Sequence, residues 1–520
     1  MRLTQVLMAG VLFMACDLVR GDSLWLPSIF SEGMVLQRDV AVPVWGRAVP
    51  GAAVTVAIYD GGTKLAEANV AAAADTGRWR AELPALPAGG RYSLLVTAKG
   101  PDKTPDEMRL FSNVLVGEVW VICGQSNMIW PMNACTERED ALAHRQEYPL
   151  IRVAMAGMRD SHTVTQPQEE TLGYWGPVKW EDAAWTITRD SGRDIPGSSS
   201  SVSYFFARAL AQWLGGKVPV GMIEVGAILP VESWVDDATV AATPELVPLR
   251  GQGYPNATGR AFLANIAPLA PYAVRGAIYY QGELNAGRPA DYYYGLKALM
   301  ASWRKAWNSP EMPFLVVQLP GFIEHLEKKT ALDMDAASLA KFDSQNADHS
   351  YCYIREAQLR ATREDAHAGL AVIIDKGEKF DIHPPSKQPV GERLALQARK
   401  RVYGDTTVVA DGPLAREFRR DGKRFAIAFD GVGGGLVAKG EVKGCELRDA
   451  AGAWHAAGVR IEKNELVVES AEVPEPVGVR YAWAGFPEVT LFNAEGLPAS
   501  PFCYPPVDFA ARQGGGQKKE

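Results

Sequence analysis

Between about residues 112 and 403, short apolar segments alternate with stretches of helical periodicity, and this alternation constrains the fold more than any other feature. Stretches of helical period are found around 202–213, 291–307 and 388–402. Strands that alternate with helices predict βαβ units, and therefore a parallel sheet with helices on both faces. Five segments have the length and composition of buried strands: 117–123, 218–226, 276–280, 313–319 and 369–375.

The regions on either side of this stretch have a different rhythm. From about residue 22 to 111, short alternating segments are broken by turns rich in Gly and Pro, which is typical of a β-sandwich. From about 404 to 513 the chain returns to short strands, and residues 514–520 are expected to form a disordered tail. The predicted fold class is α/β, with a parallel-sheet domain at 112–403 between two β domains.

The N-terminus has the pattern of an export signal over residues 1–21. Arg2 precedes an apolar run at 6–15 that is too short to span a bilayer as a permanent helix. We expect this segment to be removed and the protein to be exported, to the periplasm or the extracellular space. The pair Ala15-Cys16 is a poor match to the lipoprotein motif at which a cysteine receives a lipid. A lipid anchor at Cys16 is therefore the less favoured alternative.

Composition and charge narrow the classes of partner. The 520 residues are 47% hydrophobic and 22% charged, which suits a chain with more than one packed core. A formal net charge of -7 gives no electrostatic reason to bind nucleic acid or an anionic membrane surface. We expect no nucleic-acid partner and no integral membrane segment once the signal is removed, and the oligomeric state is left open.

The six cysteines and seven histidines show none of the spacings of a metal site. We therefore expect no metal, no cofactor and a metal-free mechanism. Cys123 is flanked by strand residues and is expected in the core. Pairing of Cys445 with Cys503 is left open, because loss of residues 1–21 would leave five cysteines and at least one unpaired thiol.

Ser126 is the candidate nucleophile. The apolar segment that begins at Val119 leads through Gly124 to this serine. A serine between a buried strand and a helix is held rigidly near the positive end of the helix, where developing negative charge is stabilised. The alternative is that Ser126 is only a helix N-cap, a position that serine often occupies.

Asp381 and His383 are candidates for the other catalytic groups. Side chains two residues apart in an extended backbone point to the same side, so the Asp381 carboxylate is expected to reach one ring nitrogen of His383. Pro384 favours an extended conformation at His383. The other ring nitrogen would then take the proton of Ser126, which predicts acyl transfer. The alternative is an exposed turn in which Asp and His occur together by chance.

Sheet topology independently predicts where these groups meet. Ser126, Gly226 and Gln281 all fall just after predicted strands. Ligand sites of parallel α/β folds lie at the carboxyl ends of the strands, so we expect these residues to converge there.

Several motifs follow one another along the chain: GQSNM at 124–128, YQGELNA at 280–286, DIHP at 381–384, Lys387, and GERLA at 391–395. In this ordered set the chain resembles the sialate O-acetylesterase-like branch of the SGNH, or GDSL-type, hydrolases. The similarity also extends to residues 26–38 and 491–502, near the two ends of the chain. The resemblance implies a three-layer α/β/α catalytic domain at 112–403, flanked by N- and C-terminal β-sandwich-like domains, and hydrolysis of O-acetyl esters on sugars.

Three positions depart from the family's pattern. Ile129 stands where a Glu is expected, and Leu284 stands where a Ser is expected. The usual Gly-Gly-Thr-Pro block appears as GAILP at 226–230, so the oxyanion glycine is uncertain by one position. Any main-chain N–H there can serve, so these changes predict altered substrate preference and leave hydrolysis intact.

A tetrahedral intermediate needs hydrogen-bond donors aimed at its oxyanion. The candidates are the main-chain N–H of Ser126, that of Gly226 or Ala227, and a side-chain amide from Gln281 or Asn285. Gln281 is the first choice among the amides because it directly follows a strand. The alternative is that either amide only ties down its own loop.

Three further residues, Glu283, Arg288 and Trp130, each have two possible roles. Glu283 either anchors its loop or contacts substrate, while Arg288 and Trp130 either line a sugar pocket or pack. We expect a secreted serine esterase that acts on an acetylated carbohydrate, with O-acetylated sialic acid as the first choice. An acetyl esterase for xylan or another glycan is the closest alternative. A catalytically silent glycan-binding protein is the alternative from another class.

Overall fold

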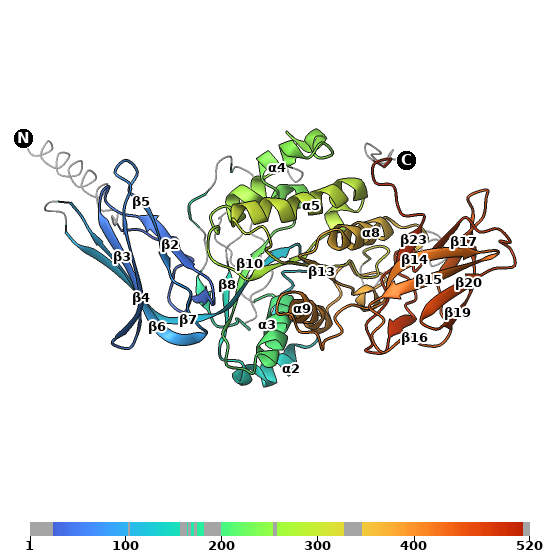
Figure 1. The fold of residues 1–520 in the computed structure, drawn as a ribbon, viewed down its shortest axis with the longest axis horizontal. Helices are drawn as coiled ribbons and strands as arrows, with labels where there is room; N and C mark the ends of the chain where they lie inside the picture. Colours follow the sequence, from blue (N-terminus) through green and yellow to red (C-terminus); the bar gives the residue numbers. More distant parts are fainter. Residues whose placement is uncertain are drawn as a thin grey trace, which may run out of the picture.

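The computed structural model describes residues 24–101, 105–155, 164, 168–170, 174–180, 199–252, 257–326 and 346–512. It is elongated, with an N-terminal β domain, a central α/β domain and a C-terminal β domain in a row (Figure 1). The expected export signal, Cys16 and the tail at 514–520 lie outside the described residues. Within those residues, no helix is both long enough and apolar enough to cross a membrane.

The central domain contains the parallel sheet that the alternation predicts. The strand order is β13-β12-β11-β7-β10-β8-β9, and each neighbouring pair from β13 to β8 is parallel. Only β9 runs antiparallel, at the edge. The strands are β7 (Glu107–Gly124), β8 (Ile151–Met155), β9 (Trp175–Gly176), β10 (Val220–Gly226), β11 (Gly276–Tyr280), β12 (Phe314–Val317) and β13 (Ala368–Ala371).

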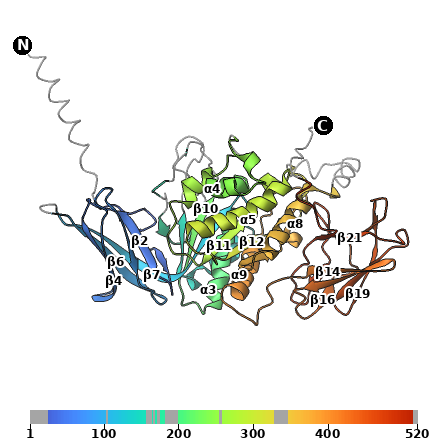
Figure 2. The ribbon, with the colours of Figure 1, turned by 45° about the horizontal axis from the view of Figure 1, so that its top comes forward.

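Helices cover both faces of this sheet, so the three-layer α/β/α expectation is confirmed (Figure 1). The pair α5 (Pro289–Ala306) and α8 (Ser350–Arg363) lies on one face, and α3 (Ser201–Trp213) and α9 (Gln388–Arg401) lie on the other. The turned view in Figure 2 shows the same separation. Two short helices, α2 (Arg138–Ala143) and α4 (Asp237–Ala242), lie outside these pairs.

Local sequence explains where α3 begins and how closely it packs. Ser200 is its N-cap, and the side chain accepts a hydrogen bond from the Ser203 N–H. Gly391 of α9 faces this helix, and a Cβ there would come within 2.5 Å of the Phe206 main-chain nitrogen. The two helices can therefore approach closely only with glycine at position 391.

The strand β7 belongs to two domains. Its first part pairs with β6 (Gly89–Lys99) and β1 (Val35–Gln37) of the N-terminal domain, and its last part pairs with β10 and β11 of the central sheet. The expected boundary at 111/112 thus falls inside a continuous strand. One hydrophobic core extends through both domains, because the strand carries buried residues from one into the other.

The N-terminal domain consists mainly of antiparallel strands, arranged in two sheets. The strands β4, β3, β6 and β7 form one sheet, with β1 parallel to β7, and β2 pairs with β5 in a second sheet. Their bounds are β1 (Val35–Gln37), β2 (Val42–Arg47), β3 (Ala53–Asp60), β4 (Thr63–Ala71), β5 (Arg78–Leu83) and β6 (Gly89–Lys99).

The C-terminal domain has its own hydrophobic core. Two four-stranded antiparallel sheets and one two-stranded sheet surround it. Cys445 and Cys503 are both free thiols. They lie on β17 and β23, and the strand β21 separates these two strands because it pairs with both of them. The strands are β14 (Leu414–Asp421), β15 (Arg424–Asp430), β16 (Leu436–Ala438), β17 (Cys445–Arg448), β18 (Trp454–Ala456), β19 (Gly458–Glu462), β20 (Glu465–Glu469), β21 (Gly478–Tyr481), β22 (Leu491–Asn493) and β23 (Phe502–Tyr504).

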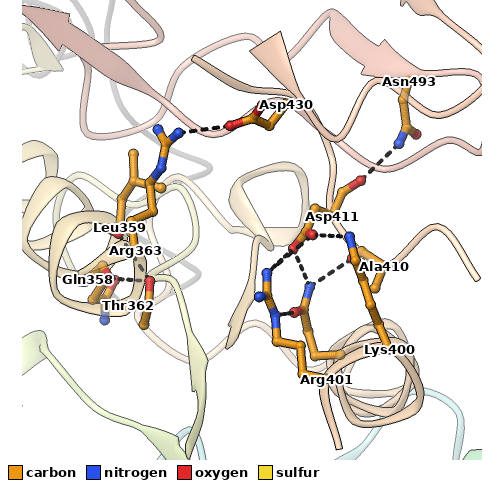
Figure 3. Close-up of polar contacts among 11 residues, drawn as sticks. Gln358, Leu359, Thr362, Arg363, Lys400, Arg401, Ala410, Asp411, Asp430 and Asn493 are labelled. Carbon is orange, nitrogen blue, oxygen red and sulfur yellow. Dashed lines mark hydrogen bonds and ion pairs between the residues drawn. The ribbon is translucent and has the colours of Figure 1, made fainter. Parts of the chain in front are cut away.

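Polar contacts attach the C-terminal domain to the central domain (Figure 3). The Asp411 carboxylate pairs with Lys400 at 2.7 Å and with Arg401 at 3.0 Å, both on α9. The Asp411 carbonyl accepts a hydrogen bond from the Asn493 side chain at 3.0 Å. On α8, Arg363 donates to Asp430 at 3.0 Å. The two ion pairs of Asp411 hold the end of α9, whose beginning adjoins the candidate site.

Candidate active site

The strand β7 delivers Ser126 to the carboxyl edge of the central sheet. At its end, a Cβ on Gly124 would come within 2.0 Å of the Tyr280 carbonyl oxygen, so glycine allows β7 and β11 to approach. The next N–H, of Gln125, donates to that carbonyl at 3.1 Å. The Gln125 carbonyl then accepts from the N–H groups of Met128 and Ile129. Ser126 is thereby held at the tip of a tight turn.

The helix that we expected to begin at Ser126 is absent from the described chain, and this expectation was wrong. The turn at residues 125–128 leads into a 3-10 helix at Met132–Ala134. Pro131 precedes that short helix in an extended conformation and forms a bridge with Ser200. Proline has no N–H to continue a helical ladder from the turn, which explains the interruption.

The structure brings His383 directly to Ser126. The ring Nε2 lies 2.7 Å from the Ser126 Oγ, within hydrogen-bonding distance. Trp130 stacks on the imidazole, with ring centroids 5.2 Å apart and an angle of 23° between the planes. Burial lowers the pKa of His383, and the positive charge of Lys387 lowers it further, against the opposing effect of Asp381. The neutral imidazole, which can accept a proton, is therefore favoured.

The geometry of Asp381 differs from the expected one. Its carboxylate accepts a hydrogen bond from the main-chain N–H of His383 at 2.9 Å, and no described contact joins it to the ring. This is an Asx turn, in which a short acidic side chain bonds the main chain two residues on. The backbone bends at 382–383 and is not extended, which explains why the carboxylate meets the main chain of His383.

His325 is a member of the site that sequence reasoning missed. Its Nδ1 lies 3.7 Å from the Asp381 carboxylate and accepts from the Ile382 N–H at 3.4 Å. The two imidazole rings of His325 and His383 are 6.3 Å apart. His325 lies beyond the end of β12 (Phe314–Val317) and not directly at it, so the strand-end rule that selected Ser126 does not indicate it.

Asn127 connects the serine to the histidine segment. Its amide nitrogen donates to the Ile382 carbonyl at 2.9 Å and to Glu283 Oε1 at 2.8 Å. Its amide oxygen accepts from Lys387 Nζ at 2.7 Å. Of the two roles open to Glu283, these contacts match the one in which it anchors its loop.

Gln281 and Asn285 lie together on the segment after β11. The Gln281 amide donates to Asn285 Oδ1 at 2.7 Å, and Asn285 donates to Glu232 at 3.0 Å. Asn285 Oδ1 also accepts from the Val231 N–H at 3.0 Å. Both side chains are fully buried, and no described contact joins either amide to Ser126. These contacts match the alternative in which the amides tie down their own loops.

The hydrogen bonds at the end of β10 decide which of Gly226 and Ala227 can serve as the main-chain donor to the oxyanion. The Ala227 N–H donates to the Gly124 carbonyl at 3.1 Å, which removes it as an oxyanion donor. A Cβ on Gly226 would come within 2.3 Å of the Ile129 side chain. In the described residues, the Ser126 N–H has no acceptor. The candidates from the main chain are therefore Ser126 and Gly226.

Arg288 is held by acidic neighbours. Its guanidinium pairs with Glu232 at 2.6 Å and with Asp291 at 3.1 Å. Trp130, in contrast, lies half-buried against His383. Of the two residues that we expected to line a pocket or to pack, Trp130 is the one that contacts a candidate catalytic group.

Comparison with known proteins decides the family. The sequence profile of the family described as carbohydrate esterase, sialic acid-specific acetylesterase, matches residues 116–380. A carbohydrate acetylesterase from Xanthomonas citri, known from a crystal structure, is 31% identical to this chain in sequence. The structural match covers 93% of this chain and 99% of that protein's chain, with a TM-score of 0.76. The chain belongs to this family. The resemblance drawn from the motifs is thereby confirmed.

Relatives in animals extend over the same length. Sialate O-acetylesterase of Pongo abelii is 26% identical over 94% of this chain and 94% of its own. The Homo sapiens protein of the same name is 25% identical over 98% of this chain and 97% of its own. The protein is therefore a carbohydrate esterase, an enzyme that hydrolyses carboxylic esters.

The departures from the family pattern now have positions in the site. Ile129 packs against Gly226, so an apolar contact occupies the place of the expected acid. Leu284 is 41% exposed on the loop after β11, beside the fully buried Asn285. Within the described residues, no group of three or more His, Cys, Asp or Glu side chains could hold a metal ion. Independence from metals stays a prediction.

Proposed function

We propose that the enzyme removes O-acetyl groups from carbohydrates with Ser126 as nucleophile and His383 as general base. The observation that supports this most strongly is the 2.7 Å contact between His383 Nε2 and Ser126 Oγ. A nucleophile within hydrogen-bonding distance of a neutral imidazole is the minimum that serine catalysis requires. Asp381 assists by holding the main chain of His383.

The reaction proceeds in two acyl transfers. Ser126 Oγ attacks the acetyl carbonyl carbon while its proton passes to His383 Nε2. The tetrahedral intermediate collapses, the C–O bond to the sugar breaks, and the imidazolium returns the proton to the sugar oxygen. Water then attacks the acetyl-serine with His383 again as base, which releases acetate and restores Ser126. The main-chain N–H groups of Ser126 and Gly226 are the proposed oxyanion donors.

The sugar is proposed from the relatives. The animal proteins are named for sialate, whereas the Xanthomonas citri enzyme is named for carbohydrate in general. We propose O-acetylated sialic acid as the first substrate to test, with acetylated xylan or another glycan as the second. The changes at Ile129 and Leu284 are the positions at which specificity is expected to differ.

Acetate release across a panel of acetylated sialosides, xylans and simple acetylated sugars tests this proposal. Ser126→Ala should remain folded and lose roughly a thousandfold or more of the activity. Activity that persists in S126A would refute the serine mechanism. Binding of a glycan by the wild-type protein without any acetate release would instead support the silent binding protein.

Export is a separate proposal, supported by the signal-like pattern of residues 1–21. Expression of the full chain with its native N-terminus, followed by mass measurement of the secreted protein, tests it. A mature chain that begins near residue 22 is the expected result. A cell-associated, uncleaved chain would contradict it, and lipid on Cys16 would support the anchored alternative.

A further inference from the structure

A buried polar cluster lies behind the contact between Ser126 and His383. It consists of Asn127, Glu283 and Lys387, and neither acyl transfer step uses it. Asn127 is 0% exposed and Lys387 is 1% exposed, which is rare for a lysine. The Oε2 atom of Glu283 is also buried, without a partner among the described residues. Burial of such groups is unfavourable, so their retention beside the site calls for an explanation.

The hydrogen bonds of this cluster fix the orientation of one amide. The Lys387 ammonium can only donate, and it donates to Asn127 Oδ1 at 2.7 Å. The Ile382 carbonyl can only accept, and it accepts from Asn127 Nδ2 at 2.9 Å. The amide therefore has one favourable orientation. Without Lys387, the amide oxygen would lose its donor, and the side chain would be held only through its nitrogen, by Ile382 and Glu283.

The hydrogen bond between Asn127 and Ile382 joins the neighbours in sequence of the two reacting side chains. Asn127 directly follows Ser126, and Ile382 directly precedes His383. One hydrogen bond between them thus sets the distance between the segment with the nucleophile and the segment with the base. A displacement of about 1 Å at such a point can lower turnover roughly a hundredfold.

Lys387 also acts on His383 through its charge. Its Nζ lies 5.6 Å from the centroid of Trp130, the ring that stacks on His383, and 5.8 Å from that of Tyr280. Burial lowers the pKa of Lys387 to about 7, against the opposing charge of Glu283. The lysine is therefore still mostly protonated at the lower pH at which a histidine titrates.

Several charged groups face this pair from different elements. For His383, Lys387 favours the neutral ring, as does His325, and Asp381 favours the charged one. For Lys387, the acidic groups are Glu283 first, followed by Cys135, Asp381 and Glu137. Burial raises the pKa of Glu283, so its negative charge is also weakened. Lys387 is the cation of this set that both contacts Asn127 and faces His383.

We propose that Lys387 is a positioning residue that, through Asn127, holds His383 against Ser126 and keeps the imidazole in its proton-accepting form. This inference rests on the proposed roles of Ser126 and His383. Asn127 transmits the position, and Glu283 completes the hydrogen bonds of its amide. The charge of Lys387 supplies the electrostatic part without contact with the reacting atoms.

The first test compares Lys387→Met with Lys400→Met, a matched change on α9 at the domain junction. Methionine fills the buried space without the charge or the donor. For p-nitrophenyl acetate, K387M should lower kcat by roughly 10- to 100-fold with KM within about twofold. The rise of kcat/KM with pH should move to higher pH, because the neutral ring loses its electrostatic support. K400M should keep the wild-type kcat and pH profile.

A second test separates positioning from charge. Asn127→Ala removes the bond to Ile382 but keeps Lys387, so kcat should fall while the pH profile stays near that of the wild type. The double variant K387M/N127A should lose little more kcat than N127A alone, because both changes act through one hydrogen bond. N127A also keeps the inference testable if K387M does not fold, as judged by thermal unfolding.

The outcomes separate this inference from the proposed function. A folded K387M enzyme with wild-type kcat and pH profile would overturn the role of Lys387. Fully additive losses in the double variant would overturn the route through Asn127. Activity that survives Ser126→Ala would instead refute the proposed nucleophile. The contact between His383 and Ser126 that Lys387 is proposed to maintain would then have no role in catalysis.

Discussion

Ser126 and His383 meet at one point but are supported in different ways. The serine turn, residues 124–129, is held by main-chain hydrogen bonds to β11 and within itself. The histidine segment, residues 379–387, has no helix or strand, and at His383 the contacts come from the side chains of Asp381, Asn127 and Trp130. Substitutions should therefore disturb the first through its backbone and the second through individual side chains.

This difference indicates where the site tolerates change. A main-chain hydrogen bond survives most side-chain substitutions, so the backbone of the serine turn should be disturbed mainly where a glycine is required. The position of the histidine segment depends on several side chains, and each of them contributes only part of its support. Substitution of any one should therefore cause a smaller loss of activity, which differs between positions and depends on pH.

The largest effect is expected on the serine side. Gly124→Ala places a Cβ 2.0 Å from the Tyr280 carbonyl oxygen, so β7 or the turn must move. We expect a loss of activity of roughly a hundredfold or more, since Ser126 shifts with the turn. The free energy of unfolding should fall by about 1–3 kcal/mol, as in other overpacked sites.

Gly215→Ala is the matched control for this prediction. Gly215 also has a positive φ, of 75°, but nothing lies within 4 Å of a Cβ there. Its replacement should lower stability by about 1 kcal/mol and leave kcat unchanged. Equal losses of activity in both variants would show that the close approach of β7 and β11 does not matter.

An intermediate effect is expected for Asp381→Asn. The asparagine oxygen can still accept the His383 main-chain N–H, so the turn should persist. We expect kcat to fall about tenfold, far less than the ~10⁴-fold found when an acid that holds the histidine tautomer is lost. Loss of the negative charge should also lower the pKa of His383, which moves the rise of kcat/KM to lower pH.

A thousandfold loss of kcat in D381N would contradict the expectation that substitutions in the histidine segment have small effects. It would show that the carboxylate moves from the main chain to the ring during the reaction. Asp381→Ala, which removes the turn as well, should lose more activity than D381N under either outcome.

The smallest effect is expected for Trp130→Leu. Leucine leaves one face of His383 open to water, and burial is the main cause of its lowered pKa. The pKa should therefore rise, and activity below neutral pH should fall by roughly three- to tenfold, with a smaller loss in alkaline solution. A loss that is equal at every pH would show that Trp130 positions the ring without desolvating it.

The sequence predicted the parallel sheet and the position of Ser126 at the end of one of its strands, because both depend on local patterns. Apolar strand segments and the glycine before Ser126 can be recognised without knowledge of distant contacts. The helix α8 was not predicted, although Tyr351, Ile354 and Ala361 recur on it at helical spacing. The polar residues Arg355, Glu356 and Gln358 are also buried in this helix, and they interrupt the apolar run on which the prediction of strands and helices depends.

The contacts of the site were less predictable because they join distant segments. Asn285 bonds Glu232, and Asn127 bonds Ile382, which the sequence places 53 and 255 residues apart. The expectation for Asp381 failed in its geometry for a local reason, since an Asx turn competed with the ring for the carboxylate. The burial of Lys387 contradicts the usual preference of lysine for solvent.

The central claim is that His383 activates Ser126 for covalent catalysis, and labelling with diethyl p-nitrophenyl phosphate tests it most directly. We expect one phosphoryl group per chain on the peptide with Ser126, with activity lost in proportion. His383→Ala should react far more slowly, because the hydroxyl lacks its base. Complete inactivation with the label on another residue, or equal labelling of H383A, would contradict the account.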